Sequence, residues 1–239
     1  MNIQSEKISY QEGGVNFHGH YFWDDEAKGK RPCILVVHDW AGCNDFAKNK
    51  AKELVEMGYV SFAVDMYGEG KIVTNTEDKM ALMGPLKENR PLLRKRILAA
   101  FNTAKKLRGV DDQRIAGIGF CFGGLCLLDL ARTGADIKAV VSFHGSLIPA
   151  EHLPNKKITA QLLVLHGYDD PMVPPTQVIS FADEMTKAEA QWQINMYGHA
   201  KHGFMNPQAH DEKLGIIYNK NAAERAWQAM GNFFVEVLK

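Results

Sequence analysis

The sequence lacks the features that mark several classes of protein. It has 28 Lys and Arg against 28 Asp and Glu, so its formal net charge is zero and no excess charge would attract nucleic acid or an anionic membrane surface. No apolar run approaches the roughly 20 residues of a membrane-spanning helix. The first ten residues contain no basic segment followed by an apolar one, which predicts no signal peptide and a cytoplasmic location. We therefore expect neither nucleic acid nor a membrane as a partner.

Cysteine is scarce as well. The four cysteines are Cys33, Cys43, Cys121 and Cys126, and no two of them have the C-x-x-C spacing of a zinc or dithiol redox motif. In a cytoplasmic protein such cysteines are expected to be free thiols, most of them buried. The sequence predicts no metal site and no cofactor.

Internal repeats, low-complexity tracts and linker-like stretches are also missing, which predicts a single domain over residues 1–239. Two strands at 7–11 and 15–23 flank Gly13-Gly14 and are typical of an antiparallel hairpin. Segment 66–90 predicts a long loop with at most a short helix. The remaining apolar runs predict strands at 32–38, 59–64, 114–120, 139–143, 158–166 and 191–197, and helices at 44–57, 91–107, 123–132, 176–187 and 219–238. Alternating strands and helices predict an α/β fold with a mostly parallel twisted sheet, an N-terminal antiparallel hairpin and helices on both faces.

The strand predicted at 114–120 runs into a helix through Gly119-Phe120-Cys121-Phe122-Gly123-Gly124. This G-x-C-x-G spacing is typical of a nucleophile elbow, a sharp turn that needs small residues on both sides of the nucleophile. The following helix N-terminus favours a thiolate, and the N–H of Phe122 is placed to bind a developing oxyanion. No serine has this spacing, so Cys121 is the candidate nucleophile. The alternative is a buried thiol in a glycine-rich turn.

Candidate acids and bases follow two other predicted strands. Asp169 and Asp170 come after strand 158–166, and His199 and His202 come after strand 191–197. In parallel sheets, ligands bind outside the carboxyl ends of the strands. The resulting chain order, Cys then Asp then His, is that of the α/β-hydrolase triad.

These motifs resemble the dienelactone hydrolase family of the α/β-hydrolase superfamily over nearly the whole chain. The resemblance implies an α/β-hydrolase fold and a triad of Cys121, Asp170 and His202, because the G-x-x-D-x-x-V-P pattern falls on Asp170 and the A-x-H-G-F pattern on His202. It leaves His199 as a loop residue. The implied activity is hydrolysis of a carboxylic ester or lactone through a thioester. The motifs that carry the resemblance are Gly119–Gly124, His166–Pro174 and Ala200–Phe204.

The resemblance also assigns residues around the triad. It implies that the backbone N–H groups of Trp40 and Phe122 form the oxyanion hole. Asp39 stands where the family usually has a glutamate that keeps the resting thiol protonated. Its shorter side chain leaves its reach to Cys121 open, and the alternative for Asp39 is a cap of its own loop.

The residues that contact the substrate are less well specified. In the family pattern an arginine that binds the dienelactone carboxylate lies four residues after the catalytic histidine, and here that residue is Asn206. Candidate substrate-binding residues are Lys201, Tyr67, Phe143 and Met205, with core packing as the alternative for the apolar ones. We expect a small-molecule ester or lactone as the substrate and a monomer or homodimer. Two other functions are possible on this scaffold, a redox-active or sensing thiol and a catalytically silent binding protein.

Overall fold

The computed structural model describes residues 1–150 and 152–239, and the chain divides into two compact units, Met1–Gly117 and Ile118–Lys239. Strand β5 (Val110–Phe120) crosses from the first unit into the second. Each unit is described by itself.

The first unit begins with the predicted hairpin. β1 (Ile3–Glu12) and β2 (Val15–Asp24) pair antiparallel along their whole length. β2 also pairs antiparallel with β4 (Val60–Val64), which runs parallel to β3 (Arg31–Val37). The strand order in this unit is β1-β2-β4-β3-β5. Every residue of β3 after Arg31 is buried, as expected for a strand covered on both faces.

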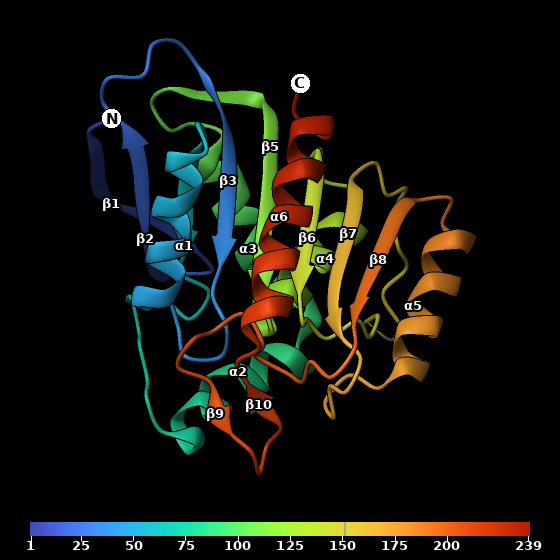
Figure 1. Ribbon diagram of the computed structural model, residues 1–239. Coiled ribbons are helices and arrows are strands. Elements are labelled where there is room, and N and C mark those ends of the chain that lie inside the picture. Colours follow the sequence, from blue (N-terminus) through green and yellow to red (C-terminus); the bar gives the residue numbers. More distant parts are fainter. Residues whose placement is uncertain (151) are drawn as a thin grey trace. The chain divides into compact units, whose positions relative to one another are not determined.

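Two helices of the first unit cover opposite faces of its strands (Figure 1). α1 (Asp45–Glu56) packs against β2, β3 and β4, and α3 (Arg90–Ala104) packs against β1 and β3. The side chains of Asn44 and Asn89 begin these helices by accepting hydrogen bonds from backbone N–H groups of the first turn. Both caps satisfy donors that a helix start would otherwise leave without a partner.

One prediction for this unit is wrong. Residues 66–90 are not a loop with at most a short helix, since α2 occupies Thr76–Glu88 and is 13 residues long. The side chain of Asn75 caps it by accepting a hydrogen bond from the N–H of Asp78 at 2.8 Å. Pro85 concealed this helix in the sequence, because proline lacks an N–H and usually ends or kinks a helix. Here Pro85 lies in the last turn of α2, and its own carbonyl accepts a hydrogen bond from the N–H of Asn89 at 2.9 Å.

The strands of the second unit are parallel and follow the order β5-β6-β7-β8. α4 and α6 cover opposite faces of β6, and α5 packs against β8 (Figure 1). A short hairpin of β9 and β10, absent from the sequence predictions, precedes α6. The bounds are β6 (Ala139–Phe143), β7 (Gln161–Gly167), β8 (Gln191–Tyr197), β9 (His210–Asp211), β10 (Ile216–Ile217), α4 (Phe122–Arg132), α5 (Pro175–Lys187) and α6 (Lys220–Val237).

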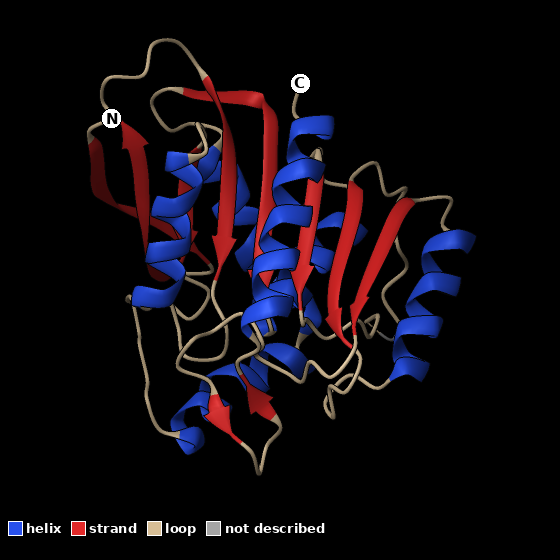
Figure 2. Cartoon of the chain, in the orientation of Figure 1, coloured by secondary structure: helices blue, strands red, loops and turns tan. Residues whose placement is uncertain are grey.

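Figure 2 shows the helices and strands of the chain. After the opening hairpin they mostly alternate in sequence, although α2 and α3 are consecutive, as are β6 and β7. The α/β prediction is confirmed, including the antiparallel start and the parallel strands that follow it. Parallel strands place their carboxyl ends at one edge of a sheet, and in such folds this edge carries the chemistry.

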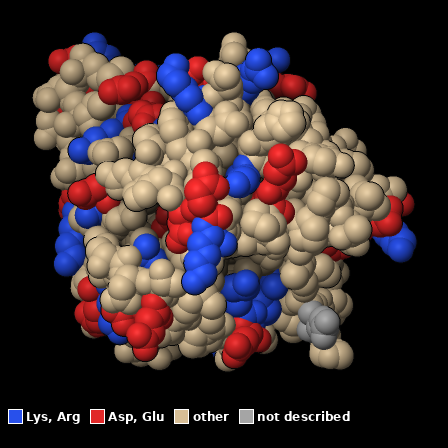
Figure 3. Space-filling model, turned by 60° about the horizontal axis from the view of Figure 1, so that its bottom comes forward, with Lys and Arg blue, Asp and Glu red and all other residues tan. Residues whose placement is uncertain are grey.

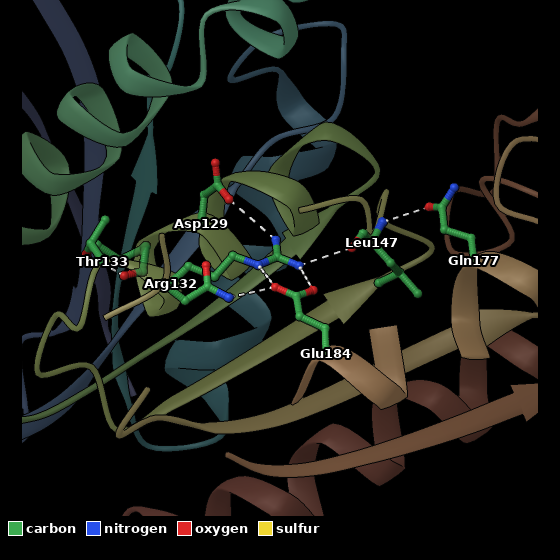
Figure 4. A network of polar contacts seen from close by, with 8 residues as sticks. Asp129, Arg132, Thr133, Leu147, Gln177 and Glu184 are labelled. Carbon is green, nitrogen blue, oxygen red and sulfur yellow. Dashed lines mark hydrogen bonds and ion pairs between the residues drawn. The ribbon is translucent and has the colours of Figure 1, made fainter. Parts of the chain in front are cut away.

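A buried ion-pair network joins the end of α4 to α5 (Figure 4). The guanidinium of Arg132, only 1% exposed, donates two hydrogen bonds of 2.8 and 2.7 Å to the carboxylate of Glu184. It also donates to the carbonyl of Leu147 at 3.1 Å and lies 3.4 Å from the carboxylate of Asp129. Bidentate pairs of this kind are strong and directional, so the network anchors the helix that begins at the elbow.

Basic and acidic side chains are interspersed on the face that Figure 3 presents, in keeping with the zero net charge of the sequence. Within the described ranges, no helix combines the length and the apolar character needed to cross a membrane.

Candidate active site

Cys121 lies between β5 and α4 in a strained turn. Its φ of 52° is in the left-handed region, which non-glycine residues rarely adopt. The N–H of Cys121 donates to the carbonyl of Phe143 at 3.0 Å, which ties the turn to the end of β6. A side chain at Gly119 would place its Cβ 2.2 Å from the carbonyl oxygen of Gly123, so only glycine fits there. The geometry of a nucleophile elbow is therefore present at the predicted cysteine.

Cys121 is the one partly exposed cysteine among the four, and all four are free thiols. Burial raises the pKa of Cys33 and of Cys43 to about 12, which keeps both thiols protonated at neutral pH. Cys126 is buried inside α4. Since the thiolate is the reactive form, the buried cysteines are poor competitors for Cys121.

Asp170 and His202 form a buried pair. The Nδ1–H of His202 donates to Oδ2 of Asp170 at 2.8 Å, and the two side chains are 5% and 0% exposed. The other carboxylate oxygen, Oδ1, accepts from the N–H groups of Met172 and Val173 at 2.8 and 3.2 Å. These contacts fix the carboxylate, and the carboxylate in turn fixes the orientation of the imidazole, which leaves Nε2 as the nitrogen that can exchange a proton with another group.

Backbone hydrogen bonds bring the two loops of this pair together. β7 and β8 are in register up to Gly167 opposite Tyr197, where both strands end. Beyond them, the N–H of Tyr168 donates to the carbonyl of Tyr197 at 2.9 Å, and the N–H of Asp169 donates to that of Ala200 at 3.0 Å. The Asp and His loops therefore run side by side from the ends of adjacent parallel strands.

Cys121 affects the pKa of His202. Burial alone lowers the pKa of His202, but the Cys121 thiolate and the Asp170 carboxylate raise it to about 10. Nε2 of His202 is buried and makes no hydrogen bond of standard geometry to the described residues. The backbone geometry agrees, because the Phe143 carbonyl that binds the N–H of Cys121 directly precedes His144, whose ring lies 5.1 Å from that of His202. Cys121, His202 and Asp170, the residues predicted as nucleophile, base and acid, thus all lie in the second unit.

The neighbouring carboxylate and imidazole form a different pair. Nδ1 of His199 lies 3.7 Å from Oδ2 of Asp169, and these side chains are 99% and 45% exposed. That distance is an ion-pair contact beyond hydrogen-bonding range. Asp170 and His202 therefore form the buried, hydrogen-bonded pair, and His199 is an exposed loop residue.

The predicted site residues of the first unit lie in two loops that contact each other. The hydroxyl of Tyr67, after β4, donates to the carbonyl of Trp40, after β3, at 2.9 Å. Oδ1 of Asp39 accepts from the N–H of Ala41 at 2.8 Å, so this carboxylate caps its own loop as the alternative prediction has it. The ammonium group of Lys79 lies 5.0 Å from the centre of the Trp40 ring.

The sequence and the structure can now be compared with known proteins. A model of the dienelactone hydrolase family matches residues 17–238. The chain belongs to that family. A protein of Aquifex aeolicus named as a carboxymethylenebutenolidase is 26% identical over 239 residues, which is 98% of this chain and 99% of the relative.

Solved structures of dienelactone hydrolase-like proteins agree along the whole chain. A dienelactone hydrolase-like promiscuous phosphotriesterase from metagenomic libraries is 33% identical with a TM-score of 0.96, and 100% of each chain is covered. The structure of m3DLH is 35% identical with a TM-score of 0.95 and the same coverage. An α/β hydrolase from a deep-sea metagenome, at 20% identity and a TM-score of 0.67, shares the fold over 99% of this chain and 98% of its own. The fold is that of the α/β hydrolases.

Two buried histidines beside the triad were not predicted. The ring of His144, which follows β6, lies 5.1 Å from the ring of His202, edge to face. Burial lowers the pKa of His144 well below its usual range, and the nearby His202 lowers it further. Burial also lowers the pKa of His166, at the end of β7. Both imidazoles are therefore neutral. The sequence signal that could have found them is their position, since one is the last residue of a predicted strand and the other directly follows one.

The substrate-binding candidates of this family member are mostly buried or paired. Phe143 is fully buried and stacks on Phe120, and Met205 is only 2% exposed, so both contribute to the core, as the alternative prediction has it. Lys201 forms an ion pair with Glu212 at 2.9 Å.

Phe122, the second predicted oxyanion donor, is the first residue of α4. No cluster of three metal-ligating side chains occurs within residues 1–150 and 152–239.

Proposed function

We propose that the protein hydrolyses small carboxylic esters or lactones with Cys121 as the nucleophile and a thioester as the intermediate. One observation carries the proposal: a cysteine in a left-handed elbow conformation lies within electrostatic reach of a buried, hydrogen-bonded His202–Asp170 pair. Nucleophile, base and orienting acid are the parts that covalent acyl transfer requires. Membership of the dienelactone hydrolase family supports the same reaction class.

In the first half of the reaction, Nε2 of His202 takes the proton from the thiol of Cys121. The thiolate attacks the carbonyl carbon, and the C=O bond opens to an oxyanion. Asp170 keeps the imidazole in the Nδ1–H tautomer and stabilises the imidazolium. Collapse of the oxyanion breaks the bond to the leaving alcohol, which takes the proton from His202. The product of this half is a Cys121 thioester.

We assign the oxyanion to the backbone N–H of Phe122, the residue after Cys121, while Trp40 as the second donor stays a prediction. Donors of this kind act where charge develops in the transition state, so they accelerate the chemical step rather than substrate binding. Asp39 caps its own loop through Ala41, and its role as a modulator of the thiol stays a prediction.

In the second half, His202 removes a proton from water, and the hydroxide attacks the thioester carbonyl. The carbon–sulfur bond breaks, the acid product leaves, and the thiolate of Cys121 recovers its proton from His202. The chain's own groups carry every proton in this scheme, so it needs no metal or cofactor.

Neutral esters and lactones are the substrates that we infer. The cationic candidate next to His202, Lys201, is paired with Glu212, and Asn206 cannot form a bidentate pair with a carboxylate. Weak turnover of the anionic dienelactone is expected. Action in the cytoplasm, as a monomer or a homodimer, also stays a prediction.

The test measures hydrolysis of p-nitrophenyl acetate together with alkylation of the protein by iodoacetamide. We expect activity to disappear in step with modification of Cys121, identified by peptide mapping, and Cys121→Ala to be inactive. Brief mixing with the ester should leave an acyl group on Cys121 that hydroxylamine removes. Inactivation that follows alkylation of Cys43 or Cys126, with Cys121 unmodified, would reject Cys121 as the nucleophile. A folded, unmodified protein without esterase activity would favour the redox-thiol or silent-binding alternatives.

A second substrate class is suggested by the structural relative that is a promiscuous phosphotriesterase, which matches this chain along its whole length. The same thiolate would attack phosphorus in place of carbon. A neutral p-nitrophenyl phosphotriester has the same leaving group as the carboxylic ester, so the two rates can be compared directly. Phosphotriester hydrolysis that survives in Cys121→Ala would separate the two activities.

A further inference from the structure

His144, the first residue after β6, lies where the elbow and the base of the second unit meet. The carbonyl of the preceding residue, Phe143, accepts a hydrogen bond from the N–H of Cys121 at 3.0 Å. The N–H of His144 donates to the carbonyl of Leu165, in β7, at 2.9 Å. The end of β6 therefore holds the Cys121 turn through its backbone, while the ring of His144 lies 5.1 Å from that of His202.

The ring of His144 is surrounded by other aromatic rings. It packs edge to face with His202 and with Phe204, at centre-to-centre distances of 5.1 and 5.2 Å and interplanar angles of 65° and 75°. The ring of Phe120, one residue before Cys121, lies 6.2 Å away. Edge-to-face pairs attract each other beyond the burial of their surfaces, because the positive edge of one ring meets the negative face of the other. His144 therefore contacts the base with a ring that two phenylalanines hold in place.

Two features of His144 cost stability. Its φ of 41° lies in the left-handed region, which residues other than glycine rarely adopt. The residue is only 3% exposed, yet neither ring nitrogen makes a hydrogen bond of standard geometry to the described residues. Buried polar groups are nearly always hydrogen-bonded, and strained backbone is found mainly where the surroundings enforce it, often at functional sites. A residue that combines both costs indicates a role other than stability.

Two requirements at this position explain why it is occupied by histidine. A left-handed backbone disfavours bulky side chains, but histidine, like asparagine and aspartate, is enriched in this conformation. Of these three residue types, histidine is the one with an aromatic ring. The contact with His202 uses that ring, so His144 satisfies the turn and the contact at once.

The titratable groups that face His202 are the thiol of Cys121, the carboxylate of Asp170 and the imidazoles of His144 and His166. Burial lowers the pKa of His144 well below its usual range, and the nearby His202 and His166 lower it further. His144 therefore stays neutral when His202 becomes charged. A neutral ring can pack on the imidazole and on the imidazolium alike, whereas a charged ring would repel the imidazolium.

We propose that His144 is a positioning residue that holds the imidazole of His202 in its reactive orientation, an inference that rests on the proposed function. Asp170 holds this imidazole through one hydrogen bond of 2.8 Å, and a single hydrogen bond does not fix the plane of a ring. Packing against His144 supplies the second restraint. Proton transfer requires the base to lie within hydrogen-bonding reach of the proton that it takes, so a base that samples other orientations reacts more slowly.

His144→Asn tests this role, because asparagine accepts the left-handed turn and removes the ring. We expect kcat for p-nitrophenyl acetate to fall about five- to tenfold, in the range that the loss of one aromatic pair predicts. KM should change by less than about twofold, because the base acts in the chemical step. His144→Phe restores a ring, so we expect it to recover most of the lost kcat.

A spectroscopic measurement follows the imidazole without relying on activity. The proton on Nδ1 of His202 is buried and hydrogen-bonded to Asp170, so it should exchange slowly with water and give a far-downfield signal in the proton NMR spectrum of the wild type. We expect the signal to broaden in His144→Asn, because a ring that moves opens this hydrogen bond more often. In His144→Phe the signal should stay sharp. The same spectra can be recorded in a Cys121→Ala background, in which the proposed reaction is blocked.

Phe181→Leu is the matched control. Phe181 is a buried aromatic residue of the same unit, in α5, and its ring centre lies 6.0 Å from the guanidinium of Arg132. We expect this variant to lower the free energy of unfolding and to leave kcat and the NMR signal unchanged. If His144→Phe does not fold, Phe204→Leu provides the second variant, since it removes a ring that packs against His144 and should lower kcat and broaden the signal.

The outcomes separate this proposal from the proposed function. Unchanged kcat and a sharp signal in His144→Asn would overturn the positioning role, as would equal losses in His144→Asn and His144→Phe or in His144→Asn and Phe181→Leu. Activity that survives in Cys121→Ala would instead overturn the proposed function. Broadening of the His202 signal in His144→Asn would support the positioning role in that case too.

Discussion

The second unit contains two histidine–aspartate pairs. Their aspartates are neighbours in the sequence, and their histidines are three positions apart. Asp170 and His202 are buried and 2.8 Å apart, whereas Asp169 and His199 are exposed and 3.7 Å apart. In both pairs the aspartate follows β7 and the histidine follows β8. What separates them is burial, because a pair removed from water keeps one geometry and interacts strongly, while an exposed pair is screened and mobile.

The most severe test of this comparison replaces each aspartate by asparagine. Asp170→Asn should lower kcat by about 10⁴, because the amide cannot hold the imidazole in the Nδ1–H tautomer or stabilise the imidazolium. Asp169→Asn should leave kcat within about twofold. Steady-state kinetics with p-nitrophenyl acetate, on variants shown by circular dichroism to be folded, would check both. Similar losses in the two variants would remove the distinction between the pairs.

The comparison extends to pairs away from the triad. Glu184→Gln should lower the free energy of unfolding by about 3 kcal/mol, because it removes the bidentate counter-charge of the buried Arg132 guanidinium and leaves only the Asp129 carboxylate at 3.4 Å. Glu212→Gln, which removes the partner of the half-exposed Lys201, should cost less than about 1 kcal/mol. Urea unfolding at neutral pH measures both values. A larger cost for Glu212→Gln than for Glu184→Gln would contradict the role given to burial.

The pH dependence of stability offers a further test of the buried pair. The pKa of His202 is raised from 6.5 to about 10 in the folded state, so the folded protein binds more protons than the unfolded one between these values. This stabilisation is complete below about pH 6.5 and is lost as the pH rises toward 10. The free energy of unfolding of the wild type should therefore fall more steeply over this window than that of His202→Gln. His199→Gln, whose side chain is fully exposed, should follow the wild type.

Much of the fold could be predicted because its signals are local. Apolar runs such as Pro32 to Val37 mark strands buried on both faces, and the G-x-C-x-G spacing marks the elbow. The choice of Asp170 and His202 over their neighbours needed the family resemblance, since composition treats the members of each pair alike. Burial of the loops, which separates the pairs physically, depends on contacts that sequence spacing does not reveal.

The features that escaped prediction depend on contacts between distant residues. Arg132 and Glu184 are 52 residues apart and Tyr67 and Trp40 are 27 apart, and no periodicity links them. α2 was missed for a local reason, since Pro85 contradicts a helix whose start is nevertheless set by Asn75. The amino-acid sequence by itself therefore predicts the candidate reacting residues more readily than the residues that hold them in place.

The backbone of His202, the proposed base, is held by a segment to which the proposed reaction assigns no role. The carbonyl of His202 accepts a hydrogen bond of 2.8 Å from the N–H of Ile217, in β10. That amide can exchange its hydrogen with solvent only when the bond to His202 opens. In a deuterium-exchange spectrum, the Ile217 resonance should therefore report how often the histidine loop leaves its place, without a label or a substitution at any residue of the triad.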